Sequence, residues 1–471
     1  AYYGSLEPPA DRDRYGGLAG SAERFGLKAT GFFAIQRMGD RVVMTTPEGN
    51  LYFSLAVNGI TALETYTRVT GREHQFEEIP PYESEYRGAY FGKDNFSFFM
   101  ANKYRKTGVF PTEHDIYMEA VERLKKWGFN GVGGHSPAKY GEAGKFPYVR
   151  MLPLSGMDWA KVPGISIFDI FAPDAAAKID RAFAQALPPH AEDRMLIGYF
   201  IDNEYEYHKF YSHVPKLKAS SAAIKGKLAE TLEEKYGTIG AFNDAWETNF
   251  RSFEDLKEAE LSLRTSQAWR DMDEFFRFYL ETFYKTVAET FRKYDPNHLL
   301  LGTRWITTVF RDDKIRGMLA ETEGRYMDVI SINDYAYAID AGLLRDVHEK
   351  SGGRPVLISE FGYGTGEQGL EPLMKNAAAD QFQRGMRYRN YVEGAASLPF
   401  VVGTHLFNYV DQAALGRYWE GEWGERYNSG LVNVADRPYK DYLKGVMDTN
   451  YEIYKVMLGE RSKFFYDFSK K

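Results

Sequence analysis

The stretch LIGYFIDNE, residues 196–204, decides the fold, because an unbroken apolar run ends abruptly in Asp202, Asn203 and Glu204. Continuous apolar runs of this length, bounded by polar residues, are typical of strands buried on both faces in a parallel sheet. A second run of the same kind, PVLISEFG at residues 355–362, leads into Glu360. The two runs predict a parallel sheet that carries acidic side chains at the carboxyl ends of its strands.

Around these two strands, helical periodicity alternates with short apolar runs, which is the pattern of a (β/α)8 barrel. A helix begins after the capping residue Thr112 and ends at Gly128, and further helices are expected near residues 173–187, 220–294, 340–350, 376–393 and 438–457. The predicted strands are 51–57, 129–132, 165–171, 195–201, 299–305, 329–332, 355–359 and 400–405. We therefore predict an α/β fold, a TIM barrel, with segments 60–111 and 205–265 inserted on βα loops.

The first fifty residues differ from the rest of the chain. Residues up to 31 are rich in Gly, Pro and charge, which indicates an extended arm. Residues 32–35 and 41–46 predict two short strands joined by a Gly-Asp turn. We expect two units: an N-terminal arm with a short β hairpin over residues 1–50, packed on a catalytic barrel over residues 51–471.

Composition excludes several functional classes. A net charge of −7 and a pI near 5.9 provide no clustered basic surface for nucleic acid. The absence of cysteine excludes disulfides and thiolate chemistry, and no apolar run is long enough to span a membrane. The nine His residues lack metal-ligand spacing, so we expect no metal and no cofactor. The 34 Tyr, 33 Phe and 7 Trp suit either an aromatic-rich core or a cleft that packs rings on sugars.

Glu204 and Glu360 end the fourth and seventh predicted strands, which lie on opposite walls of an eight-stranded barrel. Two carboxyls that face each other can cleave a glycosidic bond with retention, one as nucleophile and the other as acid/base. An amide at Asn203, beside Glu204, can bond the hydroxyl next to the anomeric carbon as charge develops, which supports the choice of Glu204 and Glu360 as the catalytic pair. A lone Glu after a strand more often caps a helix, and the neighbours Asp202 and Glu206 compete for the role of Glu204.

Other polar and aromatic residues that follow predicted strands are candidates for substrate binding. An arginine can orient a carboxylate nucleophile, and a tryptophan can stack on a sugar, but salt bridges, turns and core packing are alternative explanations. The candidates are Asn58, His135, Arg304, Trp305, Asn333, Tyr335, His405, Asn408, Tyr409, Trp419 and Trp423.

These residues resemble the retaining (β/α)8 glycosidases of clan A, which place an Asn-Glu acid/base after strand four and a Glu nucleophile after strand seven. The resemblance implies that Glu204 is the acid/base and Glu360 the nucleophile. Within that clan the chain resembles glycoside hydrolase family 50, the β-agarases. The matching segments are 46–58, 101–106, 124–131, 198–204, 359–362, 427–433 and 436–439. Residues 235–246 are also similar to a segment of family 42 β-galactosidases.

The resemblance implies exo-acting hydrolysis of β-1,4-galactosidic bonds in agarose or neoagaro-oligosaccharides, by double displacement through a glycosyl-enzyme. It also implies a hydrogen bond from Tyr335 to the nucleophile. Two alternatives stay open: a β-galactosidase or other β-glycosidase of the clan that acts on a different marine galactan, and a non-catalytic carbohydrate-binding barrel. We expect an oligosaccharide or polysaccharide substrate, no nucleic-acid or membrane partner, and a secreted or periplasmic location rather than a cytoplasmic one. The sequence leaves a homo-oligomer open.

Overall fold

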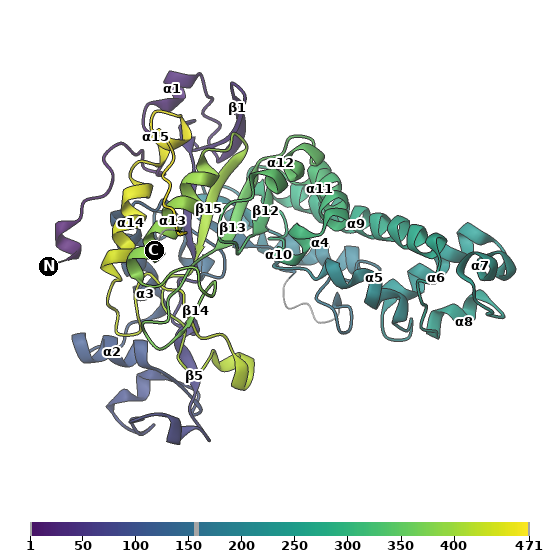
Figure 1. Ribbon diagram of the computed structural model, residues 1–471, viewed down its shortest axis with the longest axis horizontal. Helices are drawn as coiled ribbons and strands as arrows, with labels where there is room; N and C mark the ends of the chain where they lie inside the picture. The colour runs from purple at the N-terminus through teal and green to yellow at the C-terminus, as the bar shows by residue number, and fades with distance from the viewer. Residues whose placement is uncertain (1, 155–159, 470–471) are drawn as a thin grey trace.

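The molecule is built around one parallel sheet (Figure 1). The computed structural model describes residues 2–154 and 160–469, without the side chain of Trp423. The eight strands lie in the order β11-β10-β9-β8-β4-β15-β13-β12. They are β4 (Ser54–Asn58), β8 (Gly131–Val132), β9 (Tyr148–Met151), β10 (Leu196–Phe200), β11 (Leu299–Leu300), β12 (Ile330–Asn333), β13 (Val356–Phe361) and β15 (Val401–Phe407).

The sheet closes on itself. Beyond β11, Trp305 forms a parallel bridge with Ile332 of β12, and these strands lie at the two ends of the strand order. The bridge is made by Trp305 N donating to Ser331 O at 3.0 Å and Asn333 N donating to Trp305 O at 2.8 Å. Closure gives every strand two neighbours and removes the exposed edges. The predicted (β/α)8 fold is confirmed.

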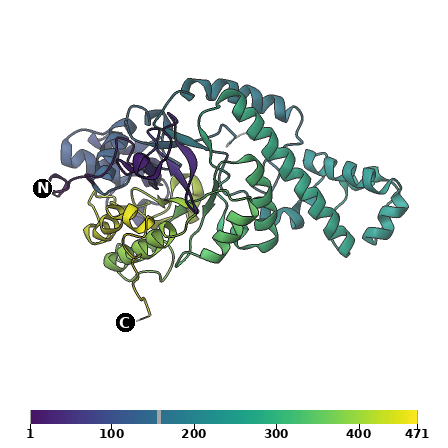
Figure 2. The ribbon, with the colours of Figure 1, turned by 90° about the horizontal axis from the view of Figure 1, so that it is seen from above.

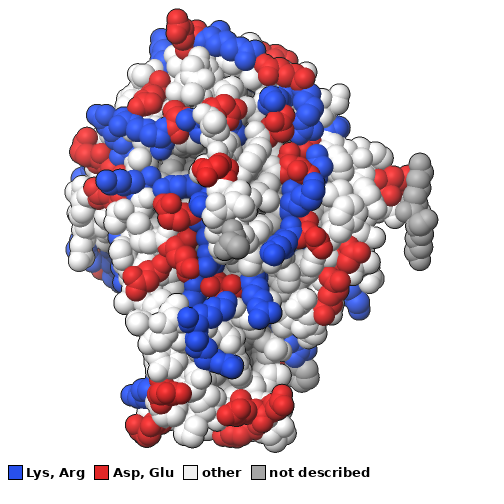
Figure 3. Space-filling model, turned by 90° about the vertical axis from the view of Figure 1, so that its left-hand side faces the viewer, with Lys and Arg blue, Asp and Glu red and all other residues white. Residues whose placement is uncertain are grey.

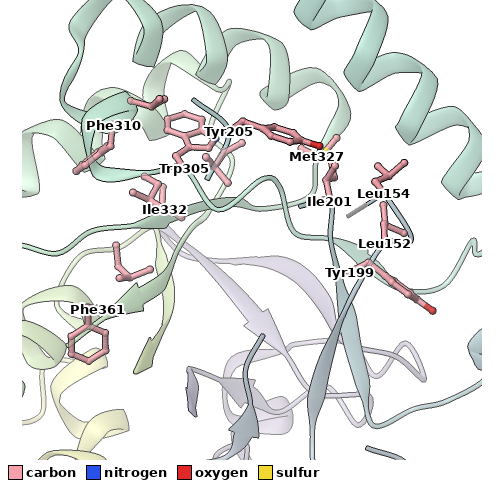
Figure 4. Close-up of a cluster of buried hydrophobic side chains, with 14 of the residues drawn as sticks. Leu152, Leu154, Tyr199, Ile201, Tyr205, Trp305, Phe310, Met327, Ile332 and Phe361 are labelled. Atoms are coloured by element: carbon pink, nitrogen blue, oxygen red, sulfur yellow. The ribbon is translucent and has the colours of Figure 1, made fainter. Parts of the chain in front are cut away.

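The residues of β10 are apolar on both faces because both faces are buried. Ile197 and Phe200 pack inside the barrel, whereas Tyr199 and Ile201 pack against the helices outside it. Figure 4 shows part of this outer layer, with Tyr199, Ile201 and Trp305 between the sheet and the helices. At Gly198 an added Cβ would lie 2.2 Å from a backbone oxygen of β11, so the neighbouring strand requires glycine there.

The third predicted strand is wrong. The structure uses β9 (Tyr148–Met151), whereas residues 165–171 form an irregular segment beneath the helices. In that segment Phe168 stacks on Phe283 of a helix, with ring centroids 5.4 Å apart, and Asp169 accepts a hydrogen bond from Ile224 N at 3.0 Å. The run is apolar because helices cover it, and an apolar run by itself does not distinguish that burial from burial in a sheet.

The helical expectations are confirmed. Thr112 caps its helix through a reciprocal capping box with Asp115, as its position before the apolar face predicts. The helices of the barrel layer are α3 (Glu113–Lys126), α4 (Ala175–Ala186), α9 (Ser266–Tyr294), α10 (Thr307–Arg311), α11 (Asp313–Tyr326), α12 (Ala341–Lys350), α13 (Gln381–Ala396), α14 (Lys440–Asn450) and α15 (Ile453–Met457).

Both predicted insertions carry structure of their own. The first follows β4 and holds an antiparallel sheet of β5 (Tyr66–Arg68), β6 (Tyr90–Phe91) and β7 (Asn95–Ser97), followed by α2 (Phe98–Thr107). The second follows β10 and holds α5 (Phe210–His213), α6 (Ala223–Tyr236), α7 (Ile239–Trp246) and α8 (Phe253–Glu258). Helices α6 to α8 project from the barrel beside one end of α9 (Figures 1 and 2). A small parallel pair, β14 (Glu371–Pro372) and β16 (Tyr427–Asn428), joins two further loops.

The N-terminal segment covers the amino ends of the barrel strands. After α1 (Ser21–Phe25), an antiparallel sheet joins β1 (Ala34–Met38), β2 (Arg41–Thr45) and β3 (Leu51–Tyr52). Phe33 and Tyr52 pack edge to face, with centroids 4.9 Å apart, in the same cluster as the side chains inside the barrel. The expected strand at residues 41–46 is confirmed, and the one at 32–35 begins slightly later, at Ala34.

Charge is mixed rather than segregated on the face shown in Figure 3, where Lys and Arg side chains alternate with Asp and Glu. Across residues 2–154 and 160–469, no helix combines the length and the apolar character needed to cross a bilayer.

Candidate active site

A cavity of about 1000 Å³ opens at the carboxyl ends of the strands and contains both glutamates. Glu360 is the second-last residue of β13, and Glu204 follows β10. Parallel strands bring their carboxyl ends to one edge, so residues far apart in the sequence meet there. The other lining residues are Glu64, His135, Asn203, Ile306, Thr307, Tyr335, Glu371, Pro372, Leu373, Met374, Lys375, Phe407, Arg417, Trp419, Glu425 and Tyr427.

Glu360 is buried and surrounded by donors. The Arg304 guanidinium bonds Oε1, and Tyr335 Oη donates to Oε2 at 2.7 Å. His135 Nε2 lies 3.4 Å from Oε1. Burial alone would raise the pKa of Glu360, but the charge of Arg304 and the bonds from His135 and Tyr335 outweigh it and lower the pKa to about 2. Glu360 is therefore a carboxylate at any ordinary pH.

Arg304 is held in one position by contacts on every side. Its side chain is fully buried, Nε donates to Asn203 Oδ1 at 2.8 Å, and Nη1 donates to Ser359 O at 3.3 Å. The guanidinium lies 4.8 Å from the ring centroid of Phe200. The φ angle of Arg304 is +53°, a left-handed conformation that costs a non-glycine residue about 1–3 kcal/mol. The surrounding contacts therefore have to hold Arg304 in this unfavourable backbone conformation.

Glu204 has the opposite electrostatic environment. Burial and, next, the negative charge of Glu360 raise the pKa of Glu204, and a hydrogen bond from Asn333 Nδ2 to its Oε1 at 3.0 Å only partly offsets them. Glu204 therefore keeps its proton to a higher pH than an ordinary glutamate does. Its φ is +53°, and its backbone N donates to Arg304 O at 3.2 Å, which joins the two unusual backbone positions.

A shared amide network connects the two carboxyls. Asn203 Oδ1 accepts from Arg304 Nε and, at 3.1 Å, from Asn333 Nδ2, so its amide nitrogen is the group that can donate to a ligand. Asn333 Oδ1 accepts from Ser359 Oγ at 2.7 Å. An ionised carboxyl and a carboxyl with a raised pKa thus share a cavity and a common hydrogen-bond network. Groups whose surroundings push their pKa values apart are typical of acid/base pairs.

The acidic neighbours of Glu204 have other surroundings. Glu206 accepts from Ser166 N at 2.9 Å and pairs with Lys209 at 2.5 Å, and these partners outweigh burial and lower its pKa. Asp202 accepts from the backbone N of Asn203 at 2.8 Å. Among the described residues that line the cavity, Glu204 is present, whereas its neighbours Asp202 and Glu206 are not.

Two candidates for substrate binding are buried behind the residues that line the cavity. Asn58 is buried, and its Nδ2 donates to Ser359 O at 3.0 Å, next to the glutamate of β13. Trp305 is 2% exposed, and its indole nitrogen donates to Glu323 at 3.0 Å on the helix side of the sheet. A sugar cannot stack on Trp305 in this position.

Three candidates on β15 and its loop are also buried. His405 lies inside the barrel with Nε2 2.9 Å from Ser54 Oγ, and burial lowers its pKa to about 3, so it is neutral. Asn408 accepts from Ser429 Oγ at 2.8 Å, and Tyr409 accepts from Arg123 at 3.0 Å. None of the three is among the described residues that line the cavity. Trp419 does line it, 48% exposed, whereas the side chain of Trp423 lies outside the described part of the chain.

One wall of the cavity was not foreseen. Arg417 pairs with Glu64 at 3.2 Å and with Glu425 at 3.0 Å, and Gln412 donates to both carboxylates at 3.1 and 2.8 Å. Glu64 lies in the first insertion and Arg417 beyond β15, segments that the pairing of β4 with β15 brings together. Nothing in the local sequence of Glu64 distinguishes it from a surface carboxylate.

Comparison with known proteins yields β-agarases and β-galactosidases. Residues 171–360 match the glycosyl hydrolase family 42 model, described as β-galactosidase. The chain is 26% identical to β-agarase B of Vibrio sp. strain JT0107, with 94% of this chain and 50% of that protein covered. It is 27% identical to β-agarase A of the same strain, with 84% and 43% covered. The chain thus spans half or less of the length of the curated relatives it matches.

Solved structures show the same fold. An exo-β-agarase superposes with a TM-score of 0.81 at 22% identity, covering 97% of this chain and 70% of that one. The protein PfGH50B gives 0.80 at 23% identity, with 96% and 70% covered. A β-galactosidase of the psychrophilic Marinomonas ef1 gives 0.52 at 13% identity, with 73% and 58% covered. The resemblance to family 50 β-agarases, and the weaker one to family 42, are confirmed.

Proposed function

We propose that this relative of the β-agarases is a retaining glycoside hydrolase that cleaves β-1,4-galactosidic bonds of agarose or neoagaro-oligosaccharides. The observation that carries the proposal is the pairing of an ionised Glu360 with a Glu204 whose raised pKa favours the protonated form, in one cavity at the carboxyl ends of the strands. Retaining glycoside hydrolysis requires those two protonation states.

In the first step, a carboxylate oxygen of Glu360 attacks the anomeric carbon and forms a glycosyl ester. The bond between that carbon and the leaving oxygen breaks, and the leaving oxygen takes the proton of Glu204. Arg304 and Tyr335 hold the attacking carboxylate in place, and neither has to move during the reaction. The amide nitrogen of Asn203 can bond the hydroxyl next to the reacting carbon as charge develops there.

In the second step, Glu204 acts as a base. Once Glu360 is esterified its charge is gone, and with it the second cause of the raised pKa of Glu204. The Glu204 carboxylate takes a proton from water, whose oxygen attacks the anomeric carbon. The ester bond breaks, Glu360 leaves as a carboxylate, and Glu204 is protonated again. Two inversions restore the original anomeric configuration.

The wall of the cavity supports a neutral sugar substrate. Trp419 is an exposed ring that can pack on a pyranose face, and Arg417, Glu64 and Glu425 present polar atoms for hydroxyls. Two carboxylates around one guanidinium disfavour a sulfated unit at this wall. We extend the proposal to exo action on the likeness to the exo-β-agarase, and to a secreted or periplasmic location because a polysaccharide does not cross membranes.

The proposal is tested by incubating the purified chain with agarose, neoagarotetraose and an aryl β-galactoside while NMR follows the anomer first formed. We expect cleavage of the first two substrates with a β-anomer as first product. Turnover of the aryl galactoside alone would assign the chain to the β-galactosidase alternative. An α-anomer as first product contradicts the retaining mechanism, and inertness on all three supports a non-catalytic barrel.

Replacing Tyr335 by phenylalanine removes one donor from Glu360 and leaves Arg304 in place. Because that donor helps to keep the pKa of Glu360 low, we expect the pKa to rise in the variant. Glu360 must be ionised to attack, so activity is lost as pH falls through its pKa, and the acidic limb of the kcat/KM profile moves to higher pH. We expect kcat to fall by about 10-fold, the effect of losing a hydrogen bond to a charged group of about 1.5 kcal/mol. An acidic limb unchanged from the wild type contradicts this role.

A further inference from the structure

A buried carboxyl lies behind the segment that carries Arg304. Glu323 of α11 is fully buried. Thr303 Oγ1 donates to Glu323 Oε1 at 2.5 Å, and Trp305 Nε1 donates to the same oxygen at 3.0 Å. Glu323 therefore bonds both residues that flank Arg304.

The flanking residues and Arg304 point in opposite directions. Arg304 enters the barrel and reaches Glu360, while Thr303 and Trp305 meet Glu323 on the helix side. Figure 4 shows Trp305 on the helix side, near Phe310. The backbone is left-handed at Gly302 and at Arg304, and a Cβ on Gly302 would lie 3.1 Å from Glu323 Oε2. The carboxyl of Glu323 thus lies against a stretch of backbone that contains two left-handed residues.

The hydrogen bonds continue from this stretch to the loop of Glu204. Thr303 Oγ1 lies 3.1 Å from Tyr284 Oη of α9, and Tyr284 Oη lies 3.2 Å from Tyr207 Oη. Tyr207 follows Glu204 closely in the chain, and its side chain is buried. A single buried chain of polar groups therefore runs behind the Arg304 segment and the Glu204 loop.

We propose that Glu323 is a positioning residue, which holds the Arg304 segment and, through Thr303 and the two tyrosines, the Glu204 loop in their reactive arrangement. It touches no reacting atom and acts by setting where the Arg304 guanidinium meets Glu360. The inference rests on the proposed function for its kinetic consequences, but the placement of Arg304 can be measured without turnover.

The protonation of Glu323 gives the proposal a second readout. Burial raises its pKa to about 7, against hydrogen bonds from Thr303 and Trp305 that lower it. Oε2 has no hydrogen-bond partner within the described part of the chain, so the proton can reside there. The folded protein thus holds a proton that the unfolded chain releases above its ordinary value of 4.5. Stability contributed by this group is present below that value and is lost as pH rises towards 7.

Two substitutions at Glu323 distinguish the role of its carboxyl oxygen as a hydrogen-bond acceptor from the role of its ionisation. Glu323→Gln keeps an oxygen for Thr303 and Trp305 and removes the ionisation, so we expect kcat within about 3-fold of the wild type. Glu323→Leu removes the acceptor, and we expect kcat to fall about 10- to 100-fold with little change in KM, as for other misplaced catalytic groups. Thermal unfolding from pH 5 to pH 8 should lose part of its pH dependence in both variants.

A control on the same helix is Glu321→Gln, whose side chain is on the surface and pairs with Arg277 at 2.6 Å. We expect wild-type kinetics from it. Crystal structures of the two Glu323 variants should show the Arg304 guanidinium displaced from Glu360 in Glu323→Leu and retained in Glu323→Gln. If the wild type cleaves none of the sugars, the proposed function fails while these structures still test the positioning role. Wild-type kcat and an unmoved Arg304 in Glu323→Leu overturn the proposal.

Discussion

Turnover should be lost almost completely in Glu360→Gln, with kcat reduced on the order of 10⁵-fold, as in other enzymes that lose a covalent nucleophile. The amide is nearly the same size and can still accept from Tyr335 and Arg304, but it is not a nucleophile at the anomeric carbon. The substitution also leaves the buried Arg304 without its counter-charge, which costs about 3–5 kcal/mol when a buried pair is broken. Unfolding curves must therefore accompany the assay on neoagarotetraose.

The smaller variant Glu360→Ala distinguishes a lost nucleophile from a damaged site. It leaves room for a small anion, so azide can attack the anomeric carbon directly in a single displacement while Glu204 still protonates the leaving group. We expect activity to return with azide and the product to be an α-glycosyl azide. A β-configured azide, or substantial activity without azide in either variant, contradicts the assignment of Glu360.

The second large effect is expected from Glu204→Gln, which removes the proton donor. We expect kcat on neoagarotetraose to fall about 10²- to 10⁴-fold, the usual contribution of general acid–base catalysis. Formation of the glycosyl-enzyme from a dinitrophenyl β-galactoside should be nearly unaffected, because that leaving group departs without a proton. In the wild type, activity is lost as pH rises through the raised pKa of Glu204, and the variant should lack this alkaline limb.

The matched control is Glu206→Gln, an acidic neighbour that faces Ser166 and Lys209. It should keep wild-type kcat and the alkaline limb. If Glu206→Gln is inactive while Glu204→Gln retains activity and its pH profile, the acid/base role belongs to Glu206. Measuring both variants on both substrates decides between these carboxyls.

The strands that carry the two glutamates were predictable because their burial is local and continuous. The runs that form β10 and β13 are covered by side chains inside the barrel and by helices outside it, so nearly every residue is apolar until the chain reaches the cavity. The same rule failed at residues 165–171, which are mostly apolar but lie under α9. Periodicity reports burial, and it does not report what covers the residue.

The subsite candidates show a similar limit. Arg304 and Trp305 are adjacent in the sequence and were equally suited to the cavity, but the backbone conformation, left-handed at Arg304, decides the direction of each. Arg304 reaches Glu360, whereas Trp305 reaches Glu323. Glu64 and Arg417 meet because β4 and β15 are neighbours in the closed sheet, a contact between residues far apart in the chain.

By itself, the sequence determined the alternation of strands and helices, the barrel that follows from it, and the two glutamates at strand ends, because these depend on local burial patterns. The tertiary structure alone decided which polar side chains turn into the cavity, and it set the pKa values of Glu204 and Glu360 apart. Those properties depend on burial and on charges and hydrogen bonds within a few ångströms, contributed by Arg304, His135, Tyr335 and Asn333 at the carboxyl ends of β11, β8 and β12. Electrostatic coupling falls with distance in space, and distance along the chain does not predict it.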